Sequence, residues 1–173
     1  MRCFISLDAP FELKNYVKDI QSSLAYFTGK KVEQDNLHLT LKLLGEINLE
    51  ELENIKLKLR EIKLKKFSAK IDSIGVFGED LIKIIWLKID GVDELQKLID
   101  NSLRELFSLE KRFMSHLTIA RVKSVEDKKD FLDKLENLNI SKMEFIVDKF
   151  KIKKSILNKS GSFYEDIEVY YLH

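Results

Sequence analysis

The sequence has little of several residues that mark common protein classes. Cys3 is the only cysteine among 173 residues, so the chain can form no internal disulfide and no cysteine-based metal site. No segment reaches the roughly 18–20 apolar residues that span a bilayer. Residues 1–8 also lack the long apolar run of a signal peptide. We therefore expect a cytoplasmic protein without a membrane segment.

Neither sign of charge is in excess. The chain has 30 Lys and Arg against 29 Asp and Glu, which gives a formal net charge of +1. This balance argues against a protein that coats nucleic acid mainly by charge, but it is compatible with a local basic groove that grips a few phosphates. With 45% hydrophobic residues, the chain can bury a substantial core.

Apolar periodicity predicts the same order of elements twice: strand, helix, strand, helix, strand. In the first half we expect strands at 2–8, 37–44 and 67–76, with helices at 11–27, after Pro10, and from Asn48 to about 64. In the second half we expect strands at 82–90, 116–122, 143–157 and 163–172, with helices at 92–107 and 125–138, the latter capped by Ser124. No Pro-, Ser- or Gly-rich linker separates the halves. We therefore expect a single domain, 1–173, of two pseudo-repeated lobes, about 1–77 and 78–173, that face each other across a groove.

A repeated motif stands at matching places in the two halves. His38-Leu39-Thr40-Leu41 and His116-Leu117-Thr118-Ile119 lie 78 residues apart. The chain has three threonines, so two given histidines would both precede a threonine at this spacing with a probability of about (3/173)², or 1 in 3,300. Either motif alone would be weak, but the repeat in register is a strong signal of a shared site.

The spacing has a physical meaning, because residues i and i+2 of a strand point to the same face. His38 and Thr40 then share one face, and His116 and Thr118 do the same in the other half. Cleaving a P–O bond needs one group that takes a proton and one that gives a proton, and two histidines suit both tasks near neutral pH. Threonine hydroxyls can hydrogen-bond the non-bridging phosphate oxygens.

Several of these residues also have a simpler interpretation. Two half-buried histidines bonded to nearby threonines would explain one motif, but hardly the repeat. His-x-Thr is not a metal-ligand spacing, and no third histidine or paired carboxylates accompany it, so we expect no metal. His173 is the last residue and is given no role. Arg121 falls at i+5 from His116, which puts it on the opposite face unless the strand bulges or ends there. Trp86 and Phe113 are expected in the core.

The motifs resemble those of the two-histidine (2H) phosphoesterase superfamily. Within it the chain is similar to the RNA 2′,3′-cyclic phosphodiesterase family, once called 2′-5′ RNA ligases. The resemblance covers nearly the whole chain and rests on four stretches: 1–8, 36–46, 113–123 and the C-terminal segments Ser155-Ile156-Leu157 and Gly161-Ser162-Phe163-Tyr164.

The resemblance implies an α+β fold with two antiparallel sheets around a central cleft and helices on the outside. It implies metal-free, cofactor-free hydrolysis of RNA 2′,3′-cyclic phosphate ends to 2′-phosphates. By resemblance His38 is the proton donor and His116 the proton acceptor. Thr40, Thr118 and Arg121 bind the phosphate. Phe4, Ser155 and Tyr164 are candidate contacts to the base or to other parts of the substrate.

Two other functions stay open at this point. The same groups would serve a reversible 2′-5′ RNA ligase acting on tRNA halves, because acid and base exchange roles when a reaction reverses. A non-catalytic binder of RNA ends would need phosphate contacts but not two titrating groups. Met114-Ser115 departs from the family pattern, where relatives usually carry a basic residue and a proline, which puts substrate grip in question. We expect a monomer.

Overall fold

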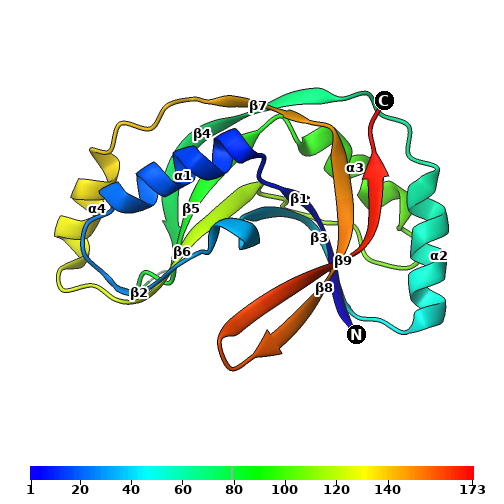
Figure 1. Cartoon of the computed structure of the whole chain (residues 1–173), viewed down its shortest axis with the longest axis horizontal. Helices are drawn as coiled ribbons and strands as arrows, with labels where there is room; N and C mark the ends of the chain where they lie inside the picture. The colour runs from blue at the N-terminus through cyan, green and yellow to red at the C-terminus, as the bar shows by residue number, and fades with distance from the viewer. Residues whose placement is uncertain (79) are drawn as a thin grey trace.

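The computed structural model describes residues 1–78 and 80–173 of the chain (Figure 1). It contains four α-helices, α1 Phe11–Ser23, α2 Leu49–Arg60, α3 Asp93–Ser102 and α4 Lys128–Glu136, and a short 3-10 helix at Gln34–Asn36. Its strands are β1 Arg2–Asp8, β2 Thr28–Lys31, β3 His38–Glu46, β4 Phe67–Phe77, β5 Ile84–Asp90, β6 His116–Ser124, β7 Glu144–Val147, β8 Lys149–Asn158 and β9 Gly161–Tyr171.

The helix starts follow from their capping residues more closely than the helix ends do. Asn48 caps α2 as predicted, and its side chain and that of Glu51 satisfy each other's backbone N–H groups in a capping box. The expected cap of α4 was wrong: Asp127, not Ser124, accepts the N–H of Asp130. Helices α1 and α3 are shorter than predicted, although apolar residues that pack on the core continue beyond both helix ends.

Two strand predictions also change. The expected helix 11–27 stops early, and the chain beyond it forms β2 against β6, a short exposed strand with no alternating apolar pattern. The expected strand 143–157 is broken at Asp148 into β7 and β8. These two pieces pair with different partners, β7 with β4 and β8 with β1.

The predicted α+β architecture with antiparallel strands is confirmed. The two expected sheets are joined into one continuous sheet in the described part of the chain. The strand order is β7-β4-β5-β6-β3-β1-β8-β9, with β2 on β6 beside this path. One residue pair, Leu39 with Leu117, joins β3 to β6 and so joins the two groups of strands. The sheet curls into an arch, and the β8–β9 hairpin projects on its concave side (Figure 1). We call β7-β4-β5-β6-β2 the first arm and β3-β1-β8-β9 the second arm.

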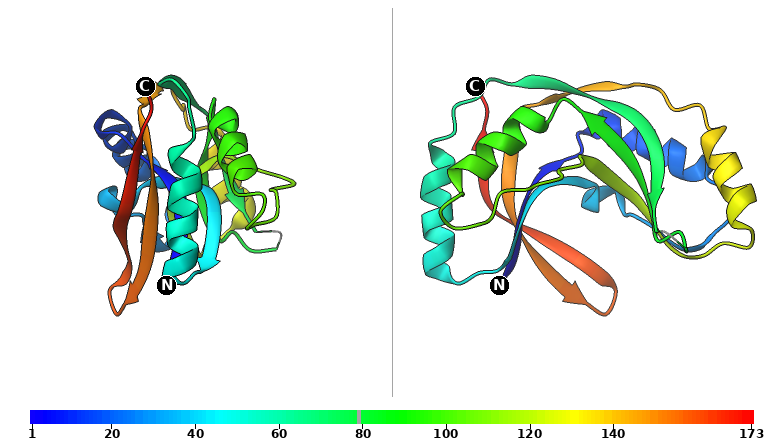
Figure 2. Two further views of the ribbon diagram at one scale, coloured as in Figure 1. Left: turned by 90° about the vertical axis from the view of Figure 1, so that its right-hand side faces the viewer. Right: turned by 180° about the vertical axis from the view of Figure 1, so that it is seen from behind.

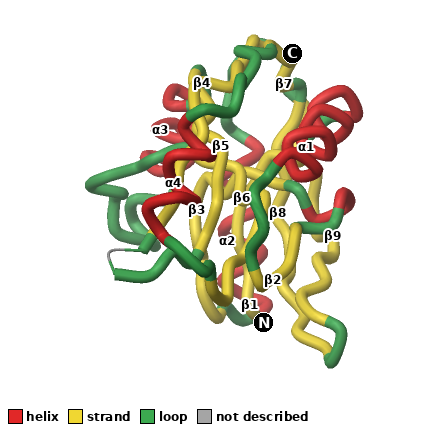
Figure 3. The backbone as a smooth tube through the Cα atoms, turned by 90° about the vertical axis from the view of Figure 1, so that its left-hand side faces the viewer, coloured by secondary structure: helices red, strands yellow, loops and turns green. Residues whose placement is uncertain are grey.

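The expected halves of the chain, about 1–77 and 78–173, exchange parts with each other. β4 of the first half pairs with β5 of the second, and β8 of the second half pairs with β1 of the first. Helices cross over too: α1 contacts β6, whereas α3 contacts β3. The helices lie around the curled strands in the views of Figures 2 and 3. The arms in space therefore take strands from both halves, and the placement of a repeat boundary near residue 77 stays a prediction.

The buried apolar residues form one cluster that runs through both arms. It includes Ile5 and Leu41 of the second arm and Ile85 and Ile119 of the first, all almost fully buried. Such a shared core holds the arms at a fixed angle. None of the helices in the described part of the chain has the length and apolar character needed to cross a membrane.

Candidate active site

The two His-x-Thr motifs lie at the junction of the arms. Leu39 and Leu117, the middle residues of the motifs, pair across β3 and β6. Because the strands are antiparallel, His38 comes next to Thr118 and Thr40 next to His116. The leucines are buried, whereas all four polar side chains are half-buried and line one cleft. The geometry thus brings together the two motifs that the sequence places 78 residues apart.

A bulge follows each motif at the same place. The pairing of β1 with β3 slips by one residue at Leu41, and that of β5 with β6 slips by one residue at Ile119. A bulge reverses the alternation of faces beyond it. Arg121 therefore returns to the face of His116 and Thr118 and lines the cleft. Without a bulge, strand alternation would place Arg121 on the opposite face from His116. A bulge is one of the exceptions foreseen from the sequence, and the structure has one.

Each histidine is held by a backbone carbonyl two residues earlier. The Nδ1 atom of His38 lies 2.7 Å from the oxygen of Asn36, and Nδ1 of His116 lies 2.9 Å from the oxygen of Met114. A carbonyl can only accept, so each Nδ1 carries a proton and donates it. Each Nε2 is then left to exchange a proton with a substrate.

Aromatic rings fix the orientation of both imidazoles. His38 lies edge-on to Tyr164, with ring centroids 4.9 Å apart, and 5.1 Å from the ring of Phe4. His116 lies edge-on to Phe77 at 5.1 Å, and Phe77 in turn contacts Trp86. Edge-to-face packing of this kind restrains ring rotation. Both histidines are thus preorganised in the absence of substrate.

A four-charge cluster lies beside His38. Lys151 and Lys153 each bind both Asp8, at 2.6 and 2.7 Å, and Asp166, at 2.6 and 3.2 Å. Asp8 is the cross-strand partner of His38. Burial tends to raise the pKa of Asp8, but the hydrogen bonds from the two lysines outweigh it and hold that pKa below its ordinary value. Asp8 is therefore an anion at neutral pH.

The pKa of His38 is lowered from its ordinary value. Burial is the main cause, and the charges of Lys153 and Arg121 act in the same direction. The carbonyl of Asn36 and the charge of Asp8 act the other way without offsetting burial. In the free protein His38 therefore favours its neutral form at neutral pH.

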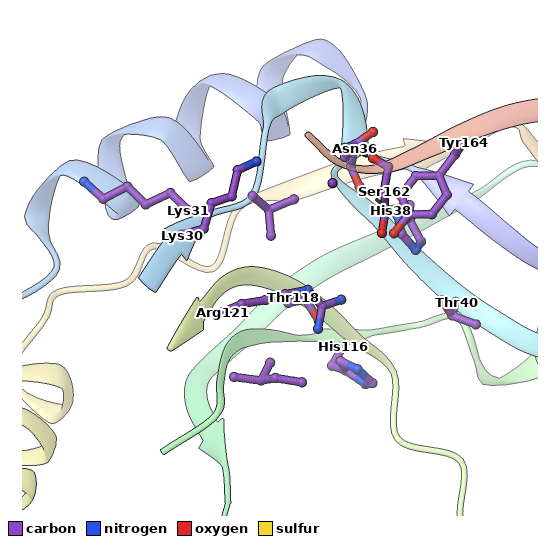
Figure 4. A pocket seen from close by; sticks show the side chains of 13 residues that line it. Lys30, Lys31, Asn36, His38, Thr40, His116, Thr118, Arg121, Ser162 and Tyr164 are labelled. Atoms are coloured by element: carbon purple, nitrogen blue, oxygen red, sulfur yellow. Dashed lines mark hydrogen bonds between the residues drawn. The ribbon is translucent and has the colours of Figure 1, made fainter. Parts of the chain in front are cut away.

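The cleft has two chambers that meet at His38 and Thr40. One, of about 350 Å³, extends to Lys30, His116 and Thr118. The other, of about 390 Å³, extends along the second arm to Arg2 and Leu43. Figure 4 shows the first chamber, with His38, Tyr164, Ser162 and Asn36 on one wall and His116, Thr118 and Arg121 on the facing wall.

Comparison with known proteins agrees with this site. A family model described as LigT like phosphoesterase matches residues 5–86 and 88–164. The chain belongs to the LigT-like phosphoesterases. Proteins named RNA 2′,3′-cyclic phosphodiesterase are similar over nearly full length: one of Methanocaldococcus jannaschii is 34% identical over 97% of this chain and 99% of its own. One of Archaeoglobus fulgidus is 32% identical over 98% and 99%.

Solved structures of LigT-like and related proteins share the fold. A protein of Thermus thermophilus superposes with a TM-score of 0.86 at 25% identity and covers 99% of this chain and 98% of its own. LigT of Escherichia coli in complex with 3′-AMP gives a TM-score of 0.79 at 22% identity, with coverage of 99% and 97%. The second likeness shows the arch-shaped fold alone.

The structure places the remaining predicted site residues in the same LigT-like cleft. Ser155 and Tyr164 line the second chamber, and Tyr164 also borders the first. Phe4 lies in the floor, with only 6% of its side chain exposed, and contacts both His38 and Tyr164. Trp86 was expected in the core but is half-buried on the cleft-facing side of β5, opposite Thr118. Phe113 packs against the core as predicted.

Several cleft residues escaped the sequence analysis. Lys30 of β2 and Asn36 of the 3-10 helix face the tip of the β8–β9 hairpin. Asn36 donates a hydrogen bond of 3.1 Å to the carbonyl oxygen of Ser162. Phe77 restrains His116 from β4. The basic pair Lys30-Lys31, shortly before the first motif, could have indicated a phosphate-binding segment. It was not singled out because it follows directly after the expected helix 11–27.

A buried ion pair supports the first motif from below. Lys42, two residues beyond Thr40, is 2% exposed and pairs with Asp100 of α3. Lys42 also donates to the carbonyl oxygen of Ser108 at 3.0 Å, and the other oxygen of Asp100 accepts the N–H of Glu110 at 2.7 Å. The pair thus fastens the segment that leads to His116 onto the strand that carries His38.

The donor set of the cleft does not suit a divalent cation. Among residues 1–78 and 80–173 there is no group of three or more His, Cys, Asp and Glu side chains placed to hold a metal ion. Of the described residues that line the two chambers, none is a carboxylate. Hard cations prefer carboxylate and carbonyl oxygens, whereas this lining offers cations, hydroxyls and imidazoles. Such a lining suits a phosphate.

Proposed function

We propose that this protein opens the 2′,3′-cyclic phosphate at an RNA end to a 2′-phosphate by acid–base chemistry at His38 and His116. The observation that carries the proposal is the junction of β3 and β6, where two imidazoles and two threonine hydroxyls meet on one cleft face. The curated relatives with this name support the choice of substrate.

In the proposed reaction a water oxygen attacks the phosphorus in line with the ribose O3′. His116 takes the proton from the water through Nε2 as the new P–O bond forms. The bond from phosphorus to O3′ breaks, and His38 gives the proton on its Nε2 to that oxygen. The products are a 2′-phosphate and a free 3′-hydroxyl. The two histidines then return to their starting states by exchanging protons with solvent.

Thr40 and Thr118 donate hydrogen bonds to the non-bridging phosphate oxygens, whose negative charge rises in the transition state. Arg121, turned into the cleft by the bulge at Ile119, adds a positive charge beside them. Phe4, Ser155 and Tyr164 border the space that remains for the sugar and base.

The lowered pKa of His38 constrains how the donor obtains its proton. A donor must enter the reaction as an imidazolium, yet burial favours neutral His38 in the free protein. The anionic phosphodiester supplies the missing negative charge when it binds, and an adjacent anion favours the charged imidazole. We therefore infer that substrate binding loads His38 with its proton.

One assay tests the proposed reaction and its independence of metals. The protein is incubated with EDTA and an RNA ending in a 2′,3′-cyclic phosphate, and the product is identified by phosphatase sensitivity and mass. A 2′-phosphate is expected. Activity that vanishes in EDTA and returns with a divalent ion would overturn the metal-free reaction. An added RNA with a 5′-hydroxyl end reveals any joining, and a joined product would favour the ligase alternative.

The division of labour between the histidines needs a different substrate. A nitrophenyl phosphodiester has a leaving group that departs as a stable anion and needs little protonation. His38→Ala should lose much less activity on it than on the natural cyclic end, whereas His116→Ala should lose similarly on both. The opposite pattern would reverse the assignment of donor and acceptor.

The setting of the reaction is also part of the proposal. We propose a cytoplasmic monomer that acts on RNA ends such as tRNA halves. Both arms of the cleft come from one chain, so the site needs no second copy. Size measurement in solution checks the monomer, and an elution that tracks activity at twice the monomer mass would contradict it.

A further inference from the structure

A like-charge pair lies at the outer edge of the first chamber. Lys30 of β2 is the direct cross-strand partner of Arg121 of β6. Directly opposed residues of an antiparallel pair point to the same face, with Cβ atoms about 5 Å apart. Two cations at that separation repel each other and destabilise the sheet. A nearby anion would offset this repulsion, and the described residues that line the chamber provide none.

The surroundings of Lys30 confirm that the compensation is missing. The described residues lining this chamber include no carboxylate. The Lys30 ammonium donates a hydrogen bond to a neutral group, the carbonyl oxygen of Ser160, at 3.3 Å. Elsewhere in the described chain many lysines are matched with acids, among them Lys56, Lys58 and Lys134. The edge of the cleft therefore carries lysine and arginine charges that no lining carboxylate balances, although the net charge of the chain is only +1.

The strand register places Lys30 and Arg121 at one level of the sheet and Thr118 at another. Thr118 pairs with Trp86 of β5, and Arg121 pairs with Ile84, two residues along the same strand. Two residues of strand span about 7 Å. The backbone positions of Arg121 and Lys30 are thus separated from that of Thr118 by roughly the spacing of successive phosphates on one nucleic-acid strand, and the long side chain of Arg121 can span this separation.

We propose that Lys30 is a specificity residue that binds a second phosphate of the substrate, the 5′-phosphate of the nucleotide that carries the cyclic end. This inference rests on the proposed function and narrows its substrate class. A nucleotide with a phosphate on its 5′ side, whether within an RNA chain or free, is the preferred substrate over one with a 5′-hydroxyl. The incoming phosphate replaces the carbonyl oxygen of Ser160 as the partner of Lys30.

The test compares two probes that differ by one phosphate: adenosine 2′,3′-cyclic phosphate with a 5′-hydroxyl, and the same compound with a 5′-phosphate. The wild type should have a kcat/KM about 10–100-fold higher for the second probe, as expected for a hydrogen bond to a charged group. Lys30→Ala should lose most of this preference, chiefly through KM. Its activity on the 5′-hydroxyl probe should fall far less. Rising salt should erode the preference in the wild type.

Two matched variants separate a specific contact from a general field. Lys31→Ala removes the same charge from the same strand and the same chamber lining, but Lys31 pairs with Ala120, not with Arg121. Its preference should fall less than that of Lys30→Ala, and equal losses would overturn the inference. Lys65→Ala, at an exposed lysine outside both chambers, should keep the full preference. Equal wild-type activity on both probes would also overturn the inference.

Measurements of ligand binding test the role of Lys30 independently of catalytic turnover. Calorimetry with adenosine 2′-phosphate and adenosine 2′,5′-bisphosphate compares product-like ligands that differ by the same phosphate. The wild type should bind the bisphosphate about 10–100-fold more tightly, and Lys30→Ala should bind the two alike. Equal affinities in the wild type would overturn the role of Lys30. Absence of turnover on every cyclic probe would instead overturn the proposed function.

Discussion

The strands that carry the two histidines, β3 and β6, have the same backbone design but different neighbours. Both alternate buried and open positions in the same order, both bulge one residue after the threonine, and both hold the histidine by a carbonyl two residues back. The shared features orient an imidazole and a hydroxyl. In the proposed reaction each side of the phosphorus is served by one such pair.

The differences begin just past the bulge. Arg121 of β6 corresponds to Leu43 of β3, and buried Ala120 corresponds to buried Lys42. The cross-strand partner of His116 is Lys88, whereas that of His38 is Asp8. A reaction with a direction, water in and O3′ out, needs two sides that are not equivalent. In the proposed mechanism the motifs therefore supply the proton-transferring and phosphate-binding groups, and the neighbouring residues make the two sides of the cleft different.

The largest effect should come from removing either histidine. His38→Ala and His116→Ala should each lower kcat on the cyclic end by about 10²–10⁴-fold, the usual worth of a general acid or base. Since the two form one acid–base couple, the double variant should be scarcely slower than the slower single variant. Single-turnover rates provide the measurement. Half of the activity remaining in each single variant would instead indicate two independent sites.

The buried pair of Lys42 has no counterpart in β6, and breaking it should mainly cost stability. Lys42→Met leaves Asp100 buried without a cation, which should lower the free energy of unfolding by about 3–5 kcal/mol. Urea unfolding measures it. Lys42→Met/Asp100→Asn should recover much of the loss. Lys58→Met, which breaks a surface pair with Glu105, is the control and should cost little.

Replacing the threonines tests whether the two hydroxyls are equivalent. Thr40→Val and Thr118→Val keep the side-chain shape and should each lower kcat by about 10–10³-fold, at most the loss of one oxyanion donor. Thr40→Ser and Thr118→Ser retain the hydroxyl and should lose far less. A valine variant that turns over like the wild type would remove that threonine from the proposed mechanism.

Exchanging Leu43 and Arg121 tests whether direction depends on the side of the cleft. Arg121→Leu should lower kcat/KM by about 10–100-fold, because a charged hydrogen bond to the phosphate is lost. Leu43→Arg in the same chain should not restore it, because Leu43 lines the second chamber alone, whereas Arg121 lines both chambers. Restored activity would mean that the two arms are interchangeable for phosphate binding.

The smallest effect should be a shift in pH dependence. A proton donor works in its charged form, so kcat/KM should fall as pH rises through the pKa of His38 in the free protein. Because burial lowers the pKa of His38, this decrease in kcat/KM should occur at a pH below the ordinary histidine pKa of about 6.5. The corresponding fall in kcat should lie at higher pH, because the bound phosphate favours imidazolium.

Asp8→Asn sharpens this measurement. The charge of Asp8 raises the pKa of His38, so its removal should move the alkaline fall in kcat/KM to still lower pH. Asp166→Asn is the control, since it loses the same two lysine contacts without facing His38. A shift in the acidic limb of the profile in place of the alkaline one would identify His38 as the acceptor.

Local patterns predicted most of the elements, because strand alternation and the N-cap at Asn48 are short-range signals. The repeated motif also predicted that the two histidines and two threonines share one cavity, but not that Leu39 pairs directly with Leu117. The bulge at Ile119 could not be predicted, because it depends on the pairing of β5 with β6. The face on which Arg121 lies could therefore not be predicted either. β2 was missed because it is exposed on all four residues and shows no apolar alternation.

The exchange of β4 and β8 between the halves has a consequence for how the enzyme holds together. Each arm is closed by a strand that begins in the other half, so neither half could build a complete sheet from its own residues. Two separate half-chains could form the same arch only by pairing their strands with each other, and the cleft with both motifs would exist only in that complex. The single covalent link between β4 and β5 replaces such an encounter with a very high effective concentration. The pairing of β4 with β5 and of β8 with β1 thus makes each arm depend on residues from both ends of the chain.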